Sequence, residues 1–478
     1  MKKNKLVALL TALLAGCAVG PDYERPAIEL PADYGIAEAE RAEAKIPADW
    51  WRLYQDETLN RLVESGLERN TDLKVAVARI EEAEAVLREA RSVFLPEIDI
   101  SGGAERGRSR NPGSSATSVR NTFTLTAGTA FELDFWGRLR RAHEAARAQY
   151  LATQYARDVV GLTLASAIAQ TYFAARSLQA QTDVATENLR VAEESLDIAR
   201  KRFEAGLISE LDVNQAESAR AAASAQLKEL QRQCDVTLHQ LGQLTGILDL
   251  KLEPGDVRKL PSPPLPPAGL PASLLERRPD VRQAEMELAS ANAAIGVARA
   301  TQFPTISLTG SYGRQSSQLA ELFNSGNRIW SIGIDLFGPI LDWGRYAART
   351  DQAIARQKQA AALYQQAAET AFREVRDALV NVAWTADAEA DLNARVSAAR
   401  NSLKLARLRY ESGYSSFLEV LDAQRTLNEA ELELVRNRQA YLSYTVDLMK
   451  ALGGGWSAEH YPPTHSAAPA ATEQQPAQ

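Results

Sequence analysis

The chain is poor in the residues from which most catalytic and metal sites are built. It has two cysteines and four histidines in 478 residues. The histidines, His143, His239, His460 and His465, show no metal-ligand spacing, and no phosphate loop, nucleophile elbow or zinc motif occurs. The sequence therefore predicts no catalytic residue, no metal and no cofactor, and it disfavours an enzyme.

Long apolar runs and a surplus of basic residues are also missing. After the N-terminal 17 residues no stretch approaches 18 uninterrupted apolar residues, which argues against a transmembrane helix. The 54 basic side chains are outnumbered by 61 acidic ones, and the formal net charge is −7. A chain with this balance is not suited to bind nucleic acid non-specifically, so nucleic acid is not an expected partner.

The N-terminus has the pattern of a bacterial lipoprotein signal. Lysines precede the apolar residues 6–14, which are too few to span a bilayer, and small residues then precede Cys17. The resemblance implies cleavage after residue 16 and acylation of Cys17; an ordinary secretory signal with an incidental cysteine is the alternative. Ala18, where an aspartate would resemble an inner-membrane retention signal, favours the outer membrane. Cys234 is then left alone, so no intrachain disulfide is expected.

The two halves of the chain repeat each other. Trp136-Gly137-Arg138 recurs as Trp343-Gly344-Arg345, and Arg202-Phe203-Glu204-Ala205-Gly206 recurs as Arg409-Tyr410-Glu411-Ser412-Gly413, each 207 residues later. Both copies read as helix, strand pair, very long helix, turn and helix. A period of this length is too large for a solenoid repeat, so we interpret it as one duplicated half.

We expect the chain to be divided so that each half forms one structural repeat. The parts are a lipoprotein signal peptide (1–16), a lipid-anchored strap (17–50), a first repeat (51–253), a proline-rich equatorial linker (254–271), a second repeat (272–453) and a disordered tail (454–478). Strands are expected within 97–135 and 305–337, and long helices over 138–204, 210–245, 344–411 and 417–452. Residues 51–95 are predicted to be helical up to Pro96.

After the first helix of each half, the apolar period changes from 3.6 to 2 residues, which predicts strands. One face of these strands is apolar over 123–135 and 330–336, whereas the opposite face carries Glu132, Asp134 and Asp335. This outward-apolar, inward-polar alternation is typical of a membrane β-barrel. A soluble sandwich half-covered by helices is the alternative.

Four strands are too few to close a barrel, because the smallest membrane barrels have about eight. Open sheet edges in lipid leave backbone groups unpaired, at roughly several kcal/mol each. The protein is therefore expected to pool strands from several copies of itself.

Aromatic and basic residues mark the ends of the strands. Aromatic side chains at strand ends suit a bilayer interface, and the candidates are Phe135, Trp136 and Trp343. Arg138, Arg140 and Arg141 follow at a helix N-terminus, where the helix dipole disfavours cations. Lipid phosphates would offset these charges; alternatively, the tryptophan packs a tight turn and the arginines are solvated.

The long helices each cover more than sixty residues, or about 100 Å at 1.5 Å per residue. Their apolar residues follow a heptad-like ladder, which in the first half is Leu189, Ala192, Leu196, Ala199 and Phe203. This spacing is typical of helices that pack along a seam. A free-standing coiled-coil rod is an alternative that fits the helices but not the strands.

The turns between the helices also repeat. Each long helix ends at a glycine, Gly206 or Gly413, where a left-handed cap is needed. Each following helix begins with a capping-box pattern, Ser209 with Asp212 and Ser416 with Glu419. The sequence thus predicts one helix hairpin per half.

These motifs together resemble the outer-membrane factors of bacterial tripartite efflux pumps, the TolC-like superfamily, and most closely its lipidated NodT or OprM-like branch. The likeness covers residues 17–453. The residues that carry it are Gly16-Cys17-Ala18-Val19-Gly20-Pro21-Asp22-Tyr23, Phe94-Leu95-Pro96, Phe135-Trp136-Gly137-Arg138, Arg409-Tyr410 with Gly413, and Leu418-Glu419-Val420-Leu421-Asp422-Ala423-Gln424.

The resemblance implies a mainly α fold with a membrane β-barrel portion. Four strands per chain would contribute to a trimeric 12-stranded β-barrel, and the long coiled-coil-like helices would form an α-barrel in the periplasm. The homotrimer would work with a periplasmic adaptor and an inner-membrane pump, as a gated passive exit for drugs, toxic compounds or metal ions. An exit duct for type I protein secretion and a non-conducting lipid-anchored coiled-coil scaffold are the alternatives.

The resemblance also places a periplasmic gate at the helix hairpins. The expected gate residues are Asp212, Tyr410, Glu419 and Asp422. Alternatively, Asp212 and Glu419 only cap helices and Asp422 is solvated surface. Ser415 stands where the TolC prototype has an arginine that locks the gate, so that latch is not expected here.

The hairpin tips are the expected docking site for the adaptor. Exposed apolar residues at a tip suit contacts with the helices of a partner, whereas local packing is the alternative. The tip residues are Gly206, Leu207, Ile208, Gly413, Tyr414 and Ser415.

Overall fold

The computed structural model describes residues 18–31, 34, 46–110, 117–266 and 274–456; Cys17, the expected signal peptide and most of the expected tail lie outside them. These residues form two compact units. The first takes its residues from 1–27, 79–154 and 283–365, and the second from 28–78, 155–282 and 366–478. In the described part of the chain, every helix is too short or too polar to serve as a membrane span.

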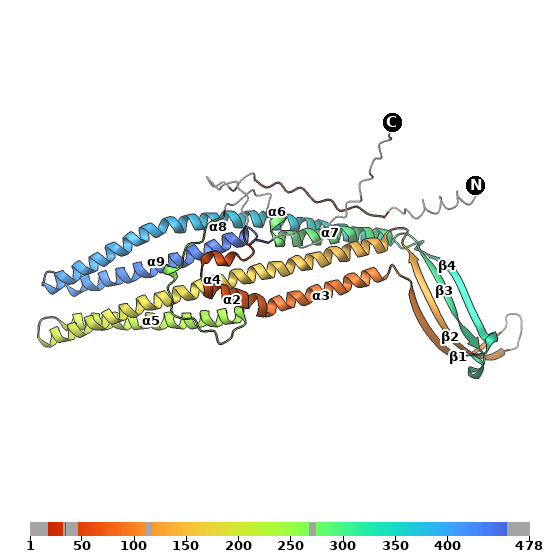
Figure 1. Cartoon of the computed structure of the whole chain (residues 1–478), viewed down its shortest axis with the longest axis horizontal. Coiled ribbons are helices and arrows are strands. Elements are labelled where there is room, and N and C mark those ends of the chain that lie inside the picture. The colour runs from red at the N-terminus through yellow and green to blue at the C-terminus, as the bar shows by residue number, and fades with distance from the viewer. Residues whose placement is uncertain (1–17, 32–33, 35–45, 111–116, 267–273, 457–478) are drawn as a thin grey trace, which may run out of the picture. The chain divides into compact units, whose positions relative to one another are not determined.

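A four-stranded antiparallel sheet is the main feature of the first unit, as Figure 1 shows. The strand order follows the sequence, so the four strands expected per chain are confirmed. Pro96 and Pro304 stand immediately before the first and third strands, where a helix cannot continue. The strands are β1 (Glu97–Arg110), β2 (Thr117–Leu133), β3 (Thr305–Ser316) and β4 (Arg328–Phe337).

The N-terminal residues 18–25 are bound to the helices of the first unit. The Val19 N–H donates a hydrogen bond to the carbonyl of Trp136 at 3.0 Å. Arg25 forms a two-bond ion pair with Glu285, at 2.6 and 2.8 Å, and Glu285 is only 1% exposed. Because a buried carboxylate without a partner is costly, this pair fixes the segment in place.

The helix predicted over residues 51–95 is not continuous. It is divided into a short 3₁₀ turn, η1 (Trp50–Tyr54), and two helices, α2 (Glu57–Arg69) and α3 (Thr71–Ser92). Asn70 causes the break, because its side-chain oxygen accepts hydrogen bonds from the N–H groups of Asp72 and Leu73, at 2.8 and 3.3 Å. A side chain that caps a new helix in this way is a helix start, which apolar spacing alone did not reveal.

The same residue ties the break to the end of a distant helix, and the second half repeats the arrangement. The Asn70 amide donates to the carbonyl of Leu244 at 3.1 Å. In the second half Arg278 lies between α6 (Leu274–Arg277) and α7 (Pro279–Ala300) and donates to the carbonyl of Ala451 at 3.2 Å. The duplication therefore preserves a contact that joins the beginning of each half to its end.

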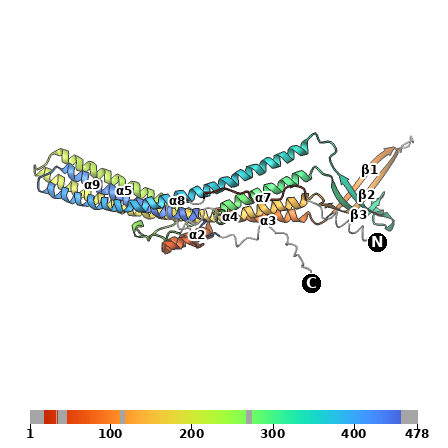
Figure 2. The same ribbon diagram turned by 90° about the horizontal axis from the view of Figure 1, so that it is seen from above.

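Two helix hairpins, α4 with α5 and α8 with α9, form much of the second unit (Figure 1, Figure 2). The turns contain Gly206 and Gly413, whose φ angles of +70° and +79° lie in the left-handed region that glycine favours. The helices are α4 (Arg138–Glu204), α5 (Glu210–Thr245), α8 (Arg345–Glu411) and α9 (Phe417–Ala451).

The heptad-like ladder is buried in its middle and exposed at its end. A buried cluster between the hairpins contains residues of both halves, whereas Phe203, the last ladder residue of the first half, is 44% exposed. Phe203 adjoins the turn, where the packed seam has ended. The buried residues are Leu196, Ala199, Ala216, Val396, Ala399, Leu403, Ala406, Phe417, Val420, Leu427 and Ala430.

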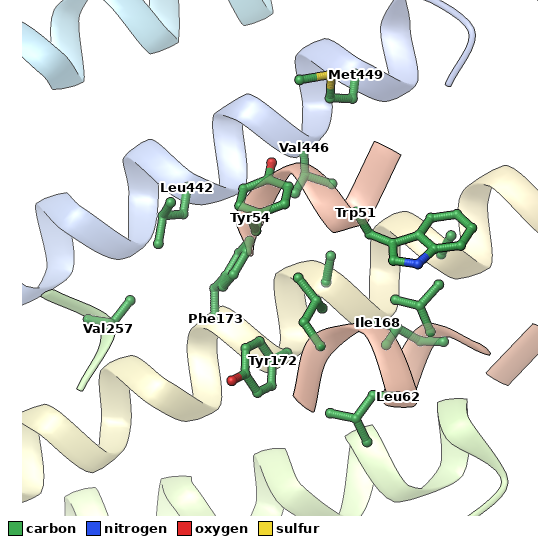
Figure 3. Packing of buried hydrophobic residues seen from close by; sticks show 14 of the residues in the cluster. Trp51, Tyr54, Leu62, Ile168, Tyr172, Phe173, Val257, Leu442, Val446 and Met449 are labelled. Carbon is green, nitrogen blue, oxygen red and sulfur yellow. The ribbon is translucent and has the colours of Figure 1, made fainter. Parts of the chain in front are cut away.

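A second, larger core holds the short N-terminal helices against α4, α5 and α9 (Figure 3). The rings of Tyr54 and Phe173 lie 5.1 Å apart, and the Tyr54 hydroxyl shares a 2.8 Å hydrogen bond with the hydroxyl of Thr445. The Tyr172 hydroxyl donates to the carboxylate of Asp56 at 2.6 Å. Burial raises the pKa of both tyrosines, so both hydroxyls remain protonated and able to donate.

Of the two predicted capping boxes, one has its characteristic acidic contact and the other is absent. The Asp212 carboxylate accepts hydrogen bonds from the N–H and the hydroxyl of Ser209, both at 3.1 Å. At the start of α9 the Ser416 side chain caps nothing, and Glu419 instead forms an ion pair with Arg409 at 3.4 Å. The prediction for Ser416 and Glu419 was therefore wrong, because a cation on the neighbouring helix competes for the carboxylate.

Replacing Asp447 by asparagine is expected to stabilise the second unit at neutral pH. Burial raises the pKa of Asp447, although the Gln170 amide donates to it at 2.7 Å, so the folded state holds the ionised carboxylate less well than the unfolded state does. Asparagine keeps an acceptor for Gln170 without the charge. We expect a gain on the order of 0.5–1 kcal/mol above the raised pKa.

The sign of the pH dependence makes this prediction specific. Because the folded-state pKa is raised, the penalty is complete above that pKa and is lost as pH falls below the unfolded value, near 3.8. Thermal unfolding followed by circular dichroism at several pH values measures the difference between Asp447→Asn and the wild type. A constant difference across pH would contradict the account.

Candidate functional site

One face of the sheet is apolar across all four strands. In the register of the strands, Ile306 lies opposite both Leu133 and Leu336, and Leu308 lies opposite Phe131 and Ile334. Directly paired residues of an antiparallel sheet project to the same face, so these side chains form one surface. The described chain leaves it open to its surroundings, since three residues of β4 are largely exposed: Ile332 (84%), Ile334 (71%) and Leu336 (69%).

The opposite face of the sheet is polar and hydrogen-bonded across the strands. The hydroxyls of Ser101 and Thr126 are 2.8 Å apart, and the Thr309 hydroxyl donates to the carboxylate of Asp335 at 3.0 Å. Asp99 faces the same way, beside Gly128. This face therefore suits contact with water, as the alternation in the sequence predicted.

The two outer strands each have a free edge. The order β1-β2-β3-β4 means that β1 pairs only with β2 and that β4 pairs only with β3 within the described chain. Every second N–H and carbonyl of these strands points outward from the sheet without a ladder partner in the same chain. A surface that is apolar on one face and unpaired at both edges can be satisfied in a membrane only by further strands.

The three expected interface aromatics lie in different surroundings. Trp136 packs within the protein: its ring stacks on Phe303 with the centroids 4.6 Å apart, and its Nε1 donates to the carbonyl of Pro304 at 2.7 Å. Phe135 is half-buried. Trp343, its φ at +55°, is 89% exposed and is the one of the three that projects freely.

The sequence reasoning missed a second aromatic pair, at the other end of the sheet. Tyr312 and Trp330 are direct cross-strand partners on the apolar face and are 59% and 73% exposed. They lie toward the loop that joins β3 to β4, whereas Trp343 lies beyond the opposite end of β4. Aromatic residues thus occur near both ends of the apolar face, as in the girdles of membrane barrels.

The arginines at the start of α4 have protein partners, so lipid phosphates are not required to offset their charge. Arg138 forms two hydrogen bonds with Glu132, at 2.6 and 3.0 Å, and Arg140 pairs with Asp134 at 3.2 Å. The buried Arg141 pairs with Asp22 at 2.6 Å and with Glu144 at 2.8 Å. Each of these arginines thus has a carboxylate partner, which neither expectation included, although Arg140 is also exposed.

Asp134 also caps α4, which explains why cations are tolerated there. Its carboxylate accepts from the N–H groups of Leu139 and Arg140, both at 2.9 Å. Asp342 has the same role at the start of α8, accepting from the N–H of Tyr346 at 2.8 Å. An aspartate shortly before each Trp-Gly-Arg motif was the available signal for these caps.

The expected gate residues lie near the turns of the two hairpins and have partners within the chain. Asp422 pairs with Arg425 at 2.8 Å, one turn farther along α9, in addition to the pairing of Glu419 with Arg409 already described. The structure therefore does not leave these carboxylates isolated, and an arginine accompanies each of them. Asp212 remains in its capping contact with Ser209.

Tyr410 packs by its ring and not by its hydroxyl. The ring lies 5.3 Å from that of Phe417, and the guanidinium carbon of Arg202 lies 4.7 Å above it. The hydroxyl is buried and has no hydrogen-bond partner among the described residues. Arg202 belongs to the first half and Tyr410 to the second, so this cation–π contact joins the two hairpins.

The tip residues alternate between exposed and packed positions. Leu207 is 72% exposed and Tyr414 is 80% exposed, each directly after the glycine of its turn. The next residues, Ile208 and Ser415, are half-buried, and Ile208 packs against the cluster between the hairpins. Each tip thus presents one large side chain, with the following residue turned inward.

A groove of about 670 Å³ opens between α4, α5 and α9 beside Asp422. Amide side chains bridge it: Gln424 donates to Asn188 and Asn428 donates to Gln226, both at 3.1 Å. These amides were not identified from the sequence, because their pairing depends on how two hairpins from different halves meet. They give the hairpins a polar contact that can be exchanged for others more easily than a packed apolar one.

Comparison with known proteins identifies the class to which this arrangement belongs. The chain matches the family model described as outer membrane efflux protein over residues 62–247 and 270–454. The two matched ranges correspond to the two halves of the duplication.

Individual relatives are similar along nearly their whole length. The solvent efflux pump outer membrane protein SrpC of Pseudomonas putida is 35% identical, and the match covers 96% of this chain and 99% of SrpC. The cation efflux system protein CusC of Escherichia coli is 34% identical, with 95% and 100% covered. The crystal structure of the Campylobacter jejuni CmeC outer membrane channel has a TM-score of 0.86 and 26% identity, with 94% of this chain and 97% of CmeC covered.

The chain belongs to the outer membrane efflux protein family. It is an outer-membrane channel of an efflux system, and the resemblance inferred from its motifs is confirmed. The two-faced sheet described above is the portion suited to the membrane.

The contacts of Tyr410 predict different effects for two substitutions. Tyr410→Phe keeps the ring and removes a hydroxyl that has no partner, so the conductance of the closed channel should remain within about twofold of the wild type. Tyr410→Ala removes the contacts with Phe417 and Arg202, each worth about 0.5–1.5 kcal/mol, and should raise the conductance. Planar-bilayer recordings measure both. An equally large rise in both variants would show that the hydroxyl matters, and no rise in either would show that the ring contacts do not hold the channel closed.

Proposed function

We propose that three copies of this chain assemble into a gated, passive exit duct for small molecules across the periplasm and the outer membrane. The observation that carries the proposal is the sheet, with one face apolar and uncovered and with both edges free. Three copies contribute 12 strands, which exceeds the roughly eight that a membrane barrel requires. The wall then has its apolar face toward lipid and its polar face toward water.

The polar face supports a water-filled passage. Ser101, Thr126 and Ser311 carry hydroxyls that are satisfied across the strands, and Asp99 and Asp335 add negative charge. Solutes that move in water can pass such a surface without a chemical step. The proposal therefore assigns no catalytic role to any residue and takes the energy for transport from a partner in the inner membrane.

We extend the proposal to the class of substrate by similarity. SrpC is described as part of a solvent efflux pump and CusC as part of a cation efflux system. We propose small toxic compounds or metal ions as the cargo of this chain, and a periplasmic adaptor as the partner that contacts the exposed Leu207 and Tyr414 at the hairpin tips. Large exposed apolar side chains at a helix turn support such docking.

We also propose that the N-terminus carries an acyl anchor on Cys17. The binding of residues 18–25 to the first unit supports it, because an anchor at residue 17 would then be held close to a fixed point of the protein. Cys17→Ala should abolish incorporation of radiolabelled palmitate while leaving the trimer intact. Labelling of Cys17→Ala equal to that of the wild type would contradict the assignment.

The gate is proposed to involve Asp212, Tyr410, Glu419 and Asp422. In a trimer, the carboxylates of Glu419 and Asp422 occur three times each near the hairpin ends. Asp422 is well exposed and lines the groove between the hairpins, so both cations and a moving helix can reach it. Asp422 and Arg425 are both exposed on α9, so a contact that either charge makes in the closed arrangement should weaken as the salt concentration rises.

Asp422→Ala tests the gate against a matched control. Glu229→Ala is the control, because Glu229 is also an exposed carboxylate on a hairpin helix and pairs with an arginine three residues later, Arg232. In planar bilayers the Asp422 variant should show a severalfold higher conductance and weaker block by divalent cations, whereas the control should resemble the wild type. Identical behaviour of the two variants would remove Asp422 from the gate.

The duct itself is tested by the purified wild-type protein. It should migrate as a heat-sensitive trimer in detergent and conduct ions in a bilayer. A monomer without conductance would overturn the proposed assembly whatever the gate variants show.

A further inference from the structure

On three of the four strands, the apolar residues of the apolar face are succeeded by arginines on the same face. These arginines lie at the end of the sheet that carries the loops between β1 and β2 and between β3 and β4. On β1 the outward series of Ile98 and Ile100 leads to Arg106 and Arg108. On β3 and β4 the first positions on the same face beyond the pair of Tyr312 and Trp330 are also arginines, Arg314 and Arg328.

The register places these arginines on the apolar face and not on the polar one. Arg314 is paired directly with Leu125 on one side and with Arg328 on the other. Arg106 is two residues beyond Ala104, which is paired with Phe123. Since side chains alternate between faces along a strand, the arginines continue the same surface as the apolar residues.

No strand residue on this face is acidic. The carboxylates of the strands, those of Glu97, Asp99, Glu105, Glu132 and Asp335, all belong to the opposite face by the same alternation. Arg106, Arg108 and Arg328 are exposed, and the residues that the structure describes supply them with no ion pair. A strand face that carries several cations and no anion suits a negatively charged partner from outside the chain.

The uncompensated positive charge is clearest at Arg314 and Arg328, which are direct cross-strand partners. Like charges directly opposite in an antiparallel pair destabilise a sheet. Arg314 donates to the carbonyls of Phe323 and Asn324 and so holds the loop between β3 and β4, but neutral carbonyls do not cancel its charge. Among the described residues Arg328 makes no such contact, so it remains available to a ligand.

We propose that Arg106, Arg108 and Arg328 bind the phosphate groups of the phosphorylated glycolipid in the outer leaflet of the outer membrane. The apolar residues of the same face contact its acyl chains, the pair of Tyr312 and Trp330 lies at the boundary, and the arginines reach the headgroups. Guanidinium groups bind phosphate through two parallel hydrogen bonds, which makes arginine suited to a phosphorylated headgroup. The trimer would carry three such clusters.

The site lies at the loop end of the sheet, whereas the helices continue from the other end, through α4 and α8. In an outer-membrane channel the loop end faces the outer leaflet. The inference depends only on the apolar face contacting the bilayer, and it does not depend on the gate, the cargo or the adaptor.

Arg120 supplies a matched control on the same end of the sheet. It is exposed and lies on β2 opposite Gly107, which places it on the polar face. The test uses purified trimers in detergent, with lipopolysaccharide as the ligand and dephosphorylated lipopolysaccharide as the comparison. Two variants are compared. The triple variant combines Arg106→Gln, Arg108→Gln and Arg328→Gln, and the control carries Arg120→Gln alone.

The wild type should bind lipopolysaccharide in preference to the dephosphorylated form. The triple variant should lose at least about tenfold in affinity, because several charge-assisted contacts are removed, and Arg120→Gln should change it less than about twofold. Both variants should keep the trimer and its conductance. Equal affinities of the two variants, or no preference of the wild type for phosphate, would overturn the proposal.

One further measurement tests the proposal without any variant. Native mass spectrometry of the wild-type trimer should detect retained lipopolysaccharide over a zwitterionic phospholipid, so the inference remains testable if the triple variant fails to assemble. Loss of the wild-type trimer itself would contradict the proposed assembly, and it would be recognised before any lipid is added.

Discussion

Unpaired backbone groups at the edges of β1 and β4 are the constraint on which the rest of the structure depends. Hydrocarbon offers no hydrogen bonds, so an N–H or carbonyl left open there costs roughly several kcal/mol. The apolar face of this sheet suits hydrocarbon, but its edges do not. Closure by further copies satisfies the edges, encloses the polar face and thereby creates a passage. Oligomerisation, membrane insertion and transport thus follow from one requirement.

At the junction between the sheet and the helices, positive side chains lie where the helix dipole is also positive. α4 begins with three arginines where its dipole is positive, and the protein solves this internally with carboxylates from β2, from the N-terminal segment and from α4 itself. Asp134 both caps the helix and pairs with Arg140. Charges that are balanced within the protein leave the junction independent of the surrounding lipid, whereas Arg106, Arg108 and Arg328 at the loop end have no carboxylate partner in the part of the chain that the structure describes.

The sequence allowed a correct prediction where a local pattern decides the structure. The change of apolar period after Pro96 and Pro304 revealed the strands and their faces, and the glycines at 206 and 413 revealed the turns. The motifs also gave the correct family. The assignments that failed depend on side-chain contacts that the spacing of apolar residues does not reveal. The helix break at Asn70 involves Leu244, and the missing box at Ser416 reflects competition by Arg409 for Glu419.

In the candidate site, too, the sequence revealed the positions of residues but not their contacts. The positions of Asp422 and Tyr410 near the turns could be read from the sequence, but their partners could not. Arg202 reaches Tyr410 from the other half of the chain, and the amides of Asn188 and Gln424 meet only when both hairpins are packed. Likewise, the pair of Tyr312 and Trp330 becomes visible only through the strand register.

The two copies of the duplicated half have kept their scaffold and changed their chemistry. Where one half joins its ends through the neutral amide of Asn70, the other uses the charged Arg278, and where one tip exposes Leu207, the other exposes Tyr414. In a ring of three chains, six hairpins would therefore alternate between an aliphatic and an aromatic kind. A partner ring with six identical subunits would place its subunits alternately against a leucine tip and a tyrosine tip. If its subunits bound only one kind of tip, the channel would offer only three equivalent binding sites.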